Sequence, residues 1–402
     1  MANTSCSELA ERVLAALNRG QDPPESDMVA LAGEPCSREF FRVIVEGLAD
    51  QFEPEHAESY ARVMARVLSR ADRSVDAQQL VERHRRIREP REYRGRDPSC
   101  VVVLSRVTLG ADVAITSRVL DAAKQRFPKA EVLLAGSRKA WELFEGDPRV
   151  GLLAVTYPRA GSLDERLKPW RELRSRLPAE ALVIDPDSRI TQLGMLPVCD
   201  EARYLFFDSR TFGGEGGDTL GALTARWSGL VLGVEGQAYL RPDQTNRAAS
   251  GPQLQCTVSL GVGENQNKRV GGAFEAELLQ ELLARGFAVT IDKGAGGEEA
   301  ERVERAVASA SGPVTVFDGA FAPFAAAIMR SDLYVGYDSA GQHVAAAAGV
   351  PLVSVFAGFP CQRMFQRWRP SGNGKIEVVK VERDSPPMVL EATRSALDRL
   401  AL

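Results

Sequence analysis

Histidine is scarce in this sequence, which holds three among 402 residues, at positions 56, 84 and 343. A metal centre built from several imidazoles is therefore excluded, as is a mechanism that needs two histidines outside the N-terminal region. The six cysteines include no pair in the CxxC spacing of zinc ribbons and redox-active motifs. Cys100 and Cys256 stand in apolar runs, so we expect both to be core thiols.

The chain also lacks an excess of one charge and a long apolar run. Lys plus Arg number 50 against 54 Asp plus Glu, so no global positive field favours nucleic acid as a partner. The most apolar stretch, residues 344–359, is too short to cross a bilayer. The first residues show no charged-then-apolar signal architecture, which predicts a cytoplasmic protein. The length predicts roughly two or three globular domains.

Residues 1–88 carry apolar side chains at helical spacing and no convincing strand. Turn signals divide them, which predicts a small bundle of four or five helices. The overlapping segment 82–97 holds seven Arg and four acids. We interpret it as a solvated linker, and the alternative is a basic strip for an anionic acceptor or a membrane surface.

From Cys100 onward, short apolar runs alternate with helical patterns, which is typical of parallel sheets covered by helices. The predicted strands are 100–105, 130–135, 150–156, 181–184 and 204–207, then 256–261, 288–292, 314–317, 333–336 and 352–356, with 376–381 at an edge. The predicted helices are 113–127, 138–144, 163–176, 189–196 and 219–232, then 274–285, 298–309, 323–329, 342–348 and 387–402.

The polar stretch 239–253 divides these repeats and is typical of an interdomain linker. We therefore predict an α/β fold class with two tandem doubly wound Rossmann-like domains, preceded by a small all-α domain. The helical domain and its linker span 1–95, and the Rossmann-like domains span 96–240 and 254–402. This architecture suits an enzyme that joins two substrates, one held by each domain.

Two strand ends carry candidate functional groups. Asp112 opens a helix after the first strand, where it is either an N-cap or a general base aimed into the cleft. The strand at 256–261 leads into a loop with Gly261, Gly263 and Lys268 that matches neither the P-loop nor GxGxxG. This loop either wraps a phosphate or presents solvent-exposed cations.

The most specific segment follows the strand at 333–336. Asp338 ends that strand, and Ser339 and Gly341 leave the next backbone open to close approach. The free amides of the helix that begins there predict an anion site. His343, in the first turn, either donates to the same anion or is a half-buried helix histidine.

Two further segments have competing interpretations. Asp185 and Asp187 spell DxD, a metal–diphosphate signature, but the proline between them indicates a simple turn. Arg363 and Arg367, near Trp368, either bind an anionic acceptor or form a basic surface helix over a packed indole.

An ordered set of motifs resembles the ADP-heptose:lipopolysaccharide heptosyltransferases, which are glycosyltransferases of family 9 with the GT-B fold. The motifs are 338–351 (DSAGQHVAAAAGVP), 355–358 (VFAG) and 368–372 (WRPSG), with 109–113 (LGADV), 126–128 (RFP) and 183–185 (VID) matching the amino-terminal part. The similarity covers roughly residues 100–383. The chain departs from the family pattern at Ala111, which stands between Gly110 and Asp112, and at 264–267 (ENQN).

The resemblance implies an inverting, metal-independent transfer of a heptose-like sugar from a nucleotide diphosphate donor to a hydroxyl acceptor. It implies no cofactor, an ADP-linked donor, and an acceptor that is a glycan, a lipid-linked glycan or a protein. The N-terminal Rossmann-like domain would hold the acceptor and the C-terminal one the nucleotide-sugar.

The resemblance also distributes roles among residues. Asp112 matches the base, and Lys268, Ser339, Gly341 and His343 match the diphosphate site. We also predict that Glu298, Glu299 and Asp338 bind the ribose or nucleotide of the donor. The residues predicted to bind the acceptor are Arg106, Arg363 and Arg367.

Two other classes of function stay open from the sequence. One is a non-enzymatic nucleotide-sugar-binding or scaffold protein, in which the helical domain carries the function. The other is a different GT-B enzyme, such as a nucleotide-sugar epimerase. We expect a cytoplasmic protein. Peripheral contact at the inner face of the membrane through the Arg-rich segment is the alternative to a solvated linker.

Overall fold

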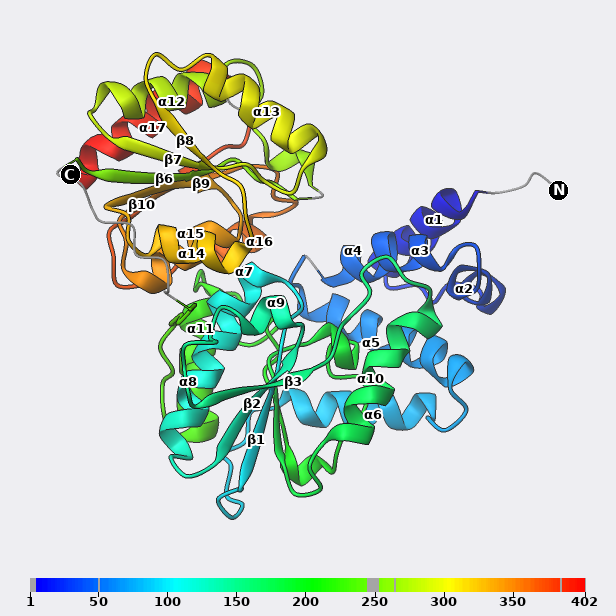
Figure 1. The fold of residues 1–402 in the computed structure, drawn as a ribbon. Coiled ribbons are helices and arrows are strands. Elements are labelled where there is room, and N and C mark those ends of the chain that lie inside the picture. Colours follow the sequence, from blue (N-terminus) through cyan, green and yellow to red (C-terminus); the bar gives the residue numbers. More distant parts are fainter. Residues whose placement is uncertain (1–4, 50, 244–252, 264, 384, 402) are drawn as a thin grey trace.

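The computed structural model describes residues 5–49, 51–243, 253–263, 265–383 and 385–401. Figure 1 shows a helical N-terminal region beside one α/β domain, with a second α/β domain above them. None of the helices in these ranges is long and apolar enough to cross a bilayer.

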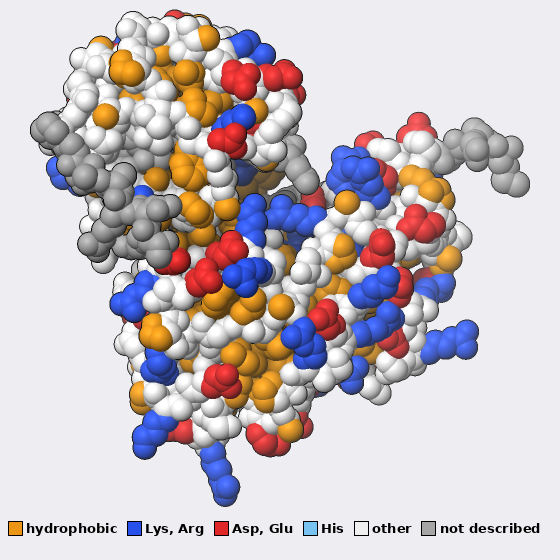
Figure 2. All heavy atoms as spheres, viewed as in Figure 1, with side chains coloured by type: hydrophobic (Ala, Val, Ile, Leu, Met, Phe, Trp, Pro, Cys, Tyr) orange, Lys and Arg blue, Asp and Glu red, His pale blue; other side chains and the backbone are white. Residues whose placement is uncertain are grey.

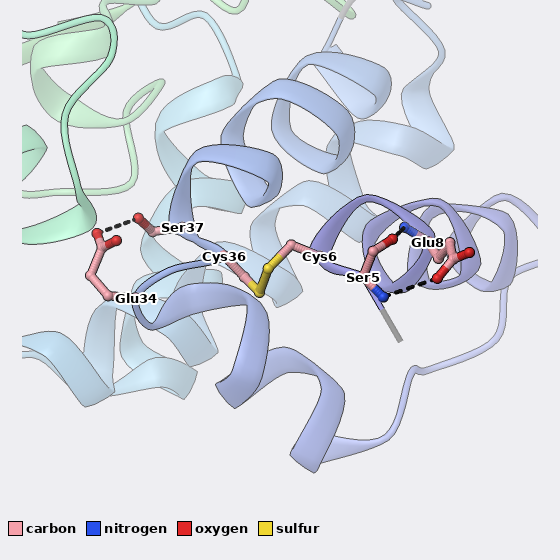
Figure 3. Close-up of a disulfide and its surroundings, with 6 residues drawn as sticks. All are labelled: Ser5, Cys6, Glu8, Glu34, Cys36 and Ser37. Atoms are coloured by element: carbon pink, nitrogen blue, oxygen red, sulfur yellow. Dashed lines mark hydrogen bonds between the residues drawn. A yellow bond between two sulfur atoms is a disulfide. The ribbon is translucent and has the colours of Figure 1, made fainter. Parts of the chain in front are cut away.

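The N-terminal region is helical, as its apolar spacing predicts. It contains α1 (Cys6–Asn18), α2 (Glu25–Ala32), α3 (Ser37–Glu39), a π-helical turn (Phe40–Val45), α4 (Glu46–Ala49), α5 (Pro54–Ala71) and α6 (Ala77–Arg88). Ser5 and Glu8 form a capping box that fixes the start of α1. A disulfide between Cys6 and Cys36 ties α1 to the turn before α3 (Figure 3), a pairing that the cysteine spacing does not indicate.

The first α/β domain is a five-stranded parallel sheet in the order β3-β2-β1-β4-β5. Its strands are β1 (Cys100–Leu104), β2 (Glu131–Gly136), β3 (Val150–Ala154), β4 (Leu182–Asp185) and β5 (Tyr204–Phe206). Its helices are α7 (Leu109–Ala111), a π-helical turn (Asp112–Thr116), α8 (Ser117–Arg126), α9 (Arg138–Trp141), α10 (Leu163–Arg176) and α11 (Leu220–Leu232).

The helical region covers one face of this sheet. Side chains alternate along a strand, so Val102 and Leu104 of β1 face one way and Val101 and Val103 the other. Val102 and Leu104 belong to one apolar core with α1, α5 and α10, whereas Val101 and Val103 pack with α8 and α11. The helical region and the sheet therefore share a single core.

The second α/β domain is a six-stranded parallel sheet in the order β11-β10-β9-β6-β7-β8. Its strands are β6 (Gln255–Ser259), β7 (Ala288–Asp292), β8 (Val314–Phe317), β9 (Leu333–Tyr337), β10 (Leu352–Phe356) and β11 (Ile376–Lys380). Its helices are α12 (Phe274–Ala284), α13 (Gly297–Ala308), α14 (Phe321–Ile328), α15 (Ala340–Ala348), α16 (Gln362–Trp368) and α17 (Pro386–Leu400).

Both sheets confirm the predicted doubly wound fold class. Each reverses its strand order beside its first strand, between β1 and β4 and between β6 and β9. Ligands in such sheets bind at the carboxyl ends of the strands, next to this reversal. The segments that carry Asp112, Lys268 and Asp338 follow β1, β6 and β9, so the topology places all three at the two reversal points.

One predicted helix is wrong. The stretch 189–196 forms only a 3₁₀ turn at Arg189–Thr191, after which Gln192 and Leu193 have φ of 50° and 58°. Thr191 explains the difference, because its hydroxyl donates to Asp185 Oδ2 at 2.5 Å and accepts the Gly194 amide at 3.0 Å. These side-chain bonds compete with a helical ladder. Of the predicted linker 239–253, positions 244–252 lie outside the described residues.

Candidate active site

A cavity of about 670 Å³ lies between the two α/β domains, lined by loops from the carboxyl ends of both sheets. Figure 1 shows α14 and α15 of the upper domain facing α7 and α9 of the lower one, and Figure 2 shows Lys and Arg side chains gathered at this junction. The cavity lining includes six of the predicted site residues, Asp112, Lys268, Glu299, Asp338, Ser339 and Gly341.

Asp112 is the acid of the lower wall, and its carboxylate is fully buried. Oδ1 accepts the Arg106 amide and the Thr116 hydroxyl, both at 2.8 Å, and Oδ2 accepts the Ser105 hydroxyl at 2.8 Å. Burial raises the pKa of Asp112 to about 6, although these three donors favour the charged form. Oδ2 accepts this one bond from the described residues and so keeps a lone pair for a substrate hydroxyl.

Asp112 does not cap its helix. The N-cap of α7 is Thr108, and Asp112 begins the π-helical turn that separates α7 from α8. A π turn holds one more residue than an α turn, and such turns are frequent at functional sites. The turn thus gives the helix room for an extra residue such as Ala111 and leaves the Asp112 carboxylate against the end of β1.

The upper wall is built from the loop after β6 and the start of α15. Lys268 Nζ lies 2.5 Å from Asp338 Oδ2 and 3.4 Å from the Asp338 carbonyl oxygen. The Ser339 hydroxyl is buried with no hydrogen-bond partner among the described residues. A Cβ on Gly341 would collide with the Tyr334 side chain, which favours glycine at this position in the first turn of α15. A cation, an unpaired hydroxyl and free helix amides therefore meet at one edge of the cavity.

His343 lies behind this edge and is not among the lining residues. It is 5% exposed, and its ring packs edge-on against Trp368 with centroids 5.9 Å apart. Burial lowers the pKa of His343 to about 4, so the imidazole is neutral at physiological pH. It can donate a hydrogen bond to an anion but adds no charge.

Comparisons with known proteins agree with this geometry. Residues 261–391 match the family model described as Glycosyltransferase family 9 (heptosyltransferase). This part of the chain is therefore similar to the heptosyltransferases. Lipopolysaccharide heptosyltransferase 3 of Escherichia coli is 34% identical over 103 residues, which are 25% of this chain and 29% of that protein. The aligned region thus spans less than a third of that relative.

Solved structures share the GT-B fold of this chain. A family 9 glycosyl transferase from Veillonella parvula has a TM-score of 0.55 and 16% identity, covering 77% of this chain and 99% of that one. The E. coli ADP-heptose lps heptosyltransferase II has a TM-score of 0.52 and 16% identity, covering 75% and 100%. The E. coli heptosyltransferase WaaC with ADP has a TM-score of 0.51 and 13% identity, covering 74% and 99%. All three leave about a quarter of this chain uncovered.

The two predicted ribose acids are separated. Glu299 lines the cavity next to Gly261 and Gly294. Glu298 is 68% exposed at its side chain and lies 4.0 Å from the Arg269 guanidinium. Of these two acids, Glu299 lines the cavity and Glu298 does not.

The three arginines predicted to bind the acceptor are absent from the cavity lining. Arg106 is 9% exposed and donates to the Pro186 carbonyl and the Ser209 hydroxyl, both at 2.8 Å. Arg363 and Arg367 donate to backbone carbonyls of the lower domain. Their roles toward an acceptor stay predictions.

The DxD sequence forms a buried turn. Asp185 accepts the Ser188 amide at 2.6 Å and the Thr191 and Tyr204 hydroxyls at 2.5 Å each. Asp187 is 2% exposed and bonds Ser209. Within the ranges that the structure describes, no group of three or more His, Cys, Asp or Glu residues could hold a metal ion.

Several lining residues escaped the sequence analysis. Lys139 and Arg159 bring cations from the lower domain, and Asp292 and Phe321 come from the upper one. Lys139 and Arg159 follow β2 and β3 closely, and Asp292 ends β7. The rule that carboxyl ends of strands carry the site could have found these three, because their strands were predicted correctly.

Proposed function

We propose that this protein is an inverting, metal-independent glycosyltransferase that moves a heptose-like sugar from a nucleotide diphosphate donor to a hydroxyl acceptor. The observation that carries the proposal is one cavity with a buried carboxylate of raised pKa on one wall and an anion-binding helix start with Lys268 on the other. The family 9 match and the fold support the same chemistry.

Asp112 is the base in this proposal. As the acceptor oxygen attacks the anomeric carbon, the hydroxyl proton passes to Asp112 Oδ2, and the bond from the sugar to the diphosphate oxygen breaks. The pKa of about 6 leaves Asp112 ionised at pH 7 but more basic than an exposed aspartate. Ser105 and the Arg106 amide hold the carboxylate in one orientation.

The upper domain stabilises the leaving diphosphate. The free amides of α15 and the unpaired Ser339 hydroxyl are donors that are already in place, and Lys268 adds a positive charge. Glu299 is placed to accept bonds from donor hydroxyls. An ADP-linked donor is proposed because the resemblance favours it, and no cofactor is needed for the transfer.

Calorimetric titration of the purified chain with ADP, UDP, GDP and CMP in the presence of a chelator tests the donor site. We expect binding, with ADP preferred. If the folded protein binds none of them, the transferase proposal fails and the scaffold alternative takes its place.

The proposal places the enzyme in the cytoplasm, with membrane contact through segment 82–97. The arginines of that segment are largely paired within the chain, since Arg86 bonds Glu201 at 2.7 Å and Arg88 bonds Asp208 at 2.6 Å. This pairing leaves little free charge for anionic lipid. Sedimentation with anionic vesicles at low and high salt tests the contact, and we expect weak, salt-sensitive binding.

A further inference from the structure

Side chains of α16 in the upper domain bind a loop of the lower domain. We call this loop, residues 212–218, the glycine-rich loop. Arg363 Nη2 and Arg367 Nη2 both donate to the Gly214 carbonyl, at 2.8 and 3.0 Å. Arg367 Nη1 donates to the Phe212 carbonyl at 2.9 Å. Arg369, just past the helix, donates to the Gly217 carbonyl at 3.0 Å. Three cationic side chains of one domain thus hold the main chain of the other.

We call these contacts the clamp, and they include no direct ion pair. In the part of the chain that the structure describes, no carboxylate forms an ion pair with Arg363, Arg367 or Arg369, and the Nε atom of each is buried without a partner. Arg367 is 1% exposed, and burial together with Arg363 lowers its pKa to about 10. Asp208 and Asp218 favour the charged form of Arg367 from a distance, but burying a guanidinium without a direct carboxylate partner is still costly.

The chain on both sides of α16 contacts segments that carry residues of the proposed donor site. Before the helix, Gly358 lies so close to the loop after β6 that a Cβ on it would be 2.7 Å from the Lys268 amide nitrogen. At the other end, Trp368 packs on the His343 ring, and its carbonyl lies 3.5 Å from Gln342 Nε2. A movement of α16 therefore disturbs the segments that carry Lys268 and the start of α15.

We propose that Arg363 and Arg367 are positioning residues that couple the placement of the lower domain to the shape of the donor site. While the clamp holds the glycine-rich loop, α16 keeps Lys268 and α15 in the geometry that binds a diphosphate. When the domains separate, the clamp is lost and the same segments loosen. This inference rests on the proposed function for the identity of the ligand, but the coupling itself is a property of the chain.

Arg367→Ala and Arg367→Lys test the coupling in the full-length protein. In the nucleotide-free state we measure amide hydrogen exchange, and we expect Arg367→Ala to speed exchange in 212–218 and also in 266–268. With ADP as the probe, we expect about tenfold weaker binding, a usual size for coupling between sites. Arg367→Lys keeps one donor and should restore part of both effects.

The loop side offers a matched pair of glycines. Gly214 and Gly233 have φ of 64° and 73°, and a Cβ added at either position would meet no atom within 4 Å, so alanine strains both backbones alike. Of these two glycines, only Gly214 offers its carbonyl to the clamp. We expect Gly214→Ala to weaken ADP binding and Gly233→Ala to leave it unchanged.

The outcomes separate the two proposals. If Arg367→Ala folds and exchange in 266–268 matches the wild type, the coupling is wrong, whatever the nucleotide affinity. If the wild type binds no nucleotide but the exchange effect appears, the coupling stands and the proposed function fails. If Arg367→Ala does not fold, the same exchange comparison is made with Arg367→Lys and Gly214→Ala.

Discussion

The two walls of the cavity differ in how far they bury and fix their polar groups. The lower wall holds one carboxylate, Asp112, out of water and fixes it with three donors. The upper wall leaves its groups partly open, with Lys268 19% exposed at its side chain and glycines on either side of it. A group that must move a proton benefits from a fixed position and a raised pKa, whereas a group that admits and releases a large anion needs access.

We expect the largest effect from a substitution of Asp112 in the lower wall. Asp112→Asn keeps the size of the side chain but removes its basicity, so we expect transfer to fall by roughly 10³-fold, at the scale of a general base. ADP affinity should stay within about twofold of wild type, since the proposed donor-binding groups lie on the other wall. Single-turnover assays and calorimetry measure the two quantities. Transfer at the wild-type rate would remove Asp112 from the mechanism.

The next effect tests the upper wall. Lys268→Ala removes the charge-assisted bond that we propose to the diphosphate, so we expect ADP binding to weaken by roughly 1.5–3 kcal/mol. Asp338 loses its partner in the same variant, so Asp338→Asn serves as the control for that loss. An unchanged ADP affinity in Lys268→Ala would show that the cation does not meet the donor.

Burial of the Asp112 carboxylate also lowers the free energy of unfolding when the group is ionised. The pKa of Asp112 is higher in the folded chain than in the unfolded one, so ionisation from about pH 4 to pH 6 destabilises the fold. Asp112→Asn should therefore raise the free energy of unfolding at pH 8 by about 3 kcal/mol, from a shift of roughly two pKa units. The difference should vanish near pH 4, where the wild-type acid is neutral. Denaturant titrations at both pH values check this, and the transfer rate should rise with pH through about 6.

The smallest expected effect comes from a comparison of Glu298 and Glu299, which are neighbours on α13. Glu299 lines the cavity and Glu298 faces solvent, so Glu299→Gln should weaken ADP binding by about threefold to tenfold, the size of one hydrogen bond. Glu298→Gln should leave it unchanged and is the matched control. Equal effects of both substitutions would indicate a general change of charge instead of contact with the donor.

Much of the cavity could be predicted because strand ends are local features. The strands that precede Asp112, Lys268 and Asp338 are short apolar runs with glycine after them, and parallel topology brings their ends together. The role of Arg363 and Arg367 could not be predicted, since their acceptors are carbonyls about 150 residues away in sequence. The π turn at Asp112 and the Cys6–Cys36 disulfide depend on tertiary packing in the same way.

The failed helix at 189–196 shows a different limit. Its apolar spacing is helical, but the Thr191 hydroxyl donates to the buried carboxylate of Asp185, six residues earlier at the end of β4. This bond forms in place of a regular helix. A pattern of apolar residues does not reveal which polar group will be within reach once the sheet has formed.

The core shared between the helical region and β1 has a consequence for synthesis on the ribosome. The residues that cover the sheet emerge first, and the sheet face that they need ends only at Phe206. Until then α5 and α6 can pack against each other and against the other N-terminal helices, but not against the sheet. A chain that starts at residue 96 has the sheet without its cover, because Val102, Leu104 and Val183 then face water. The first ninety residues and the sheet should therefore appear, and disappear, in one cooperative transition.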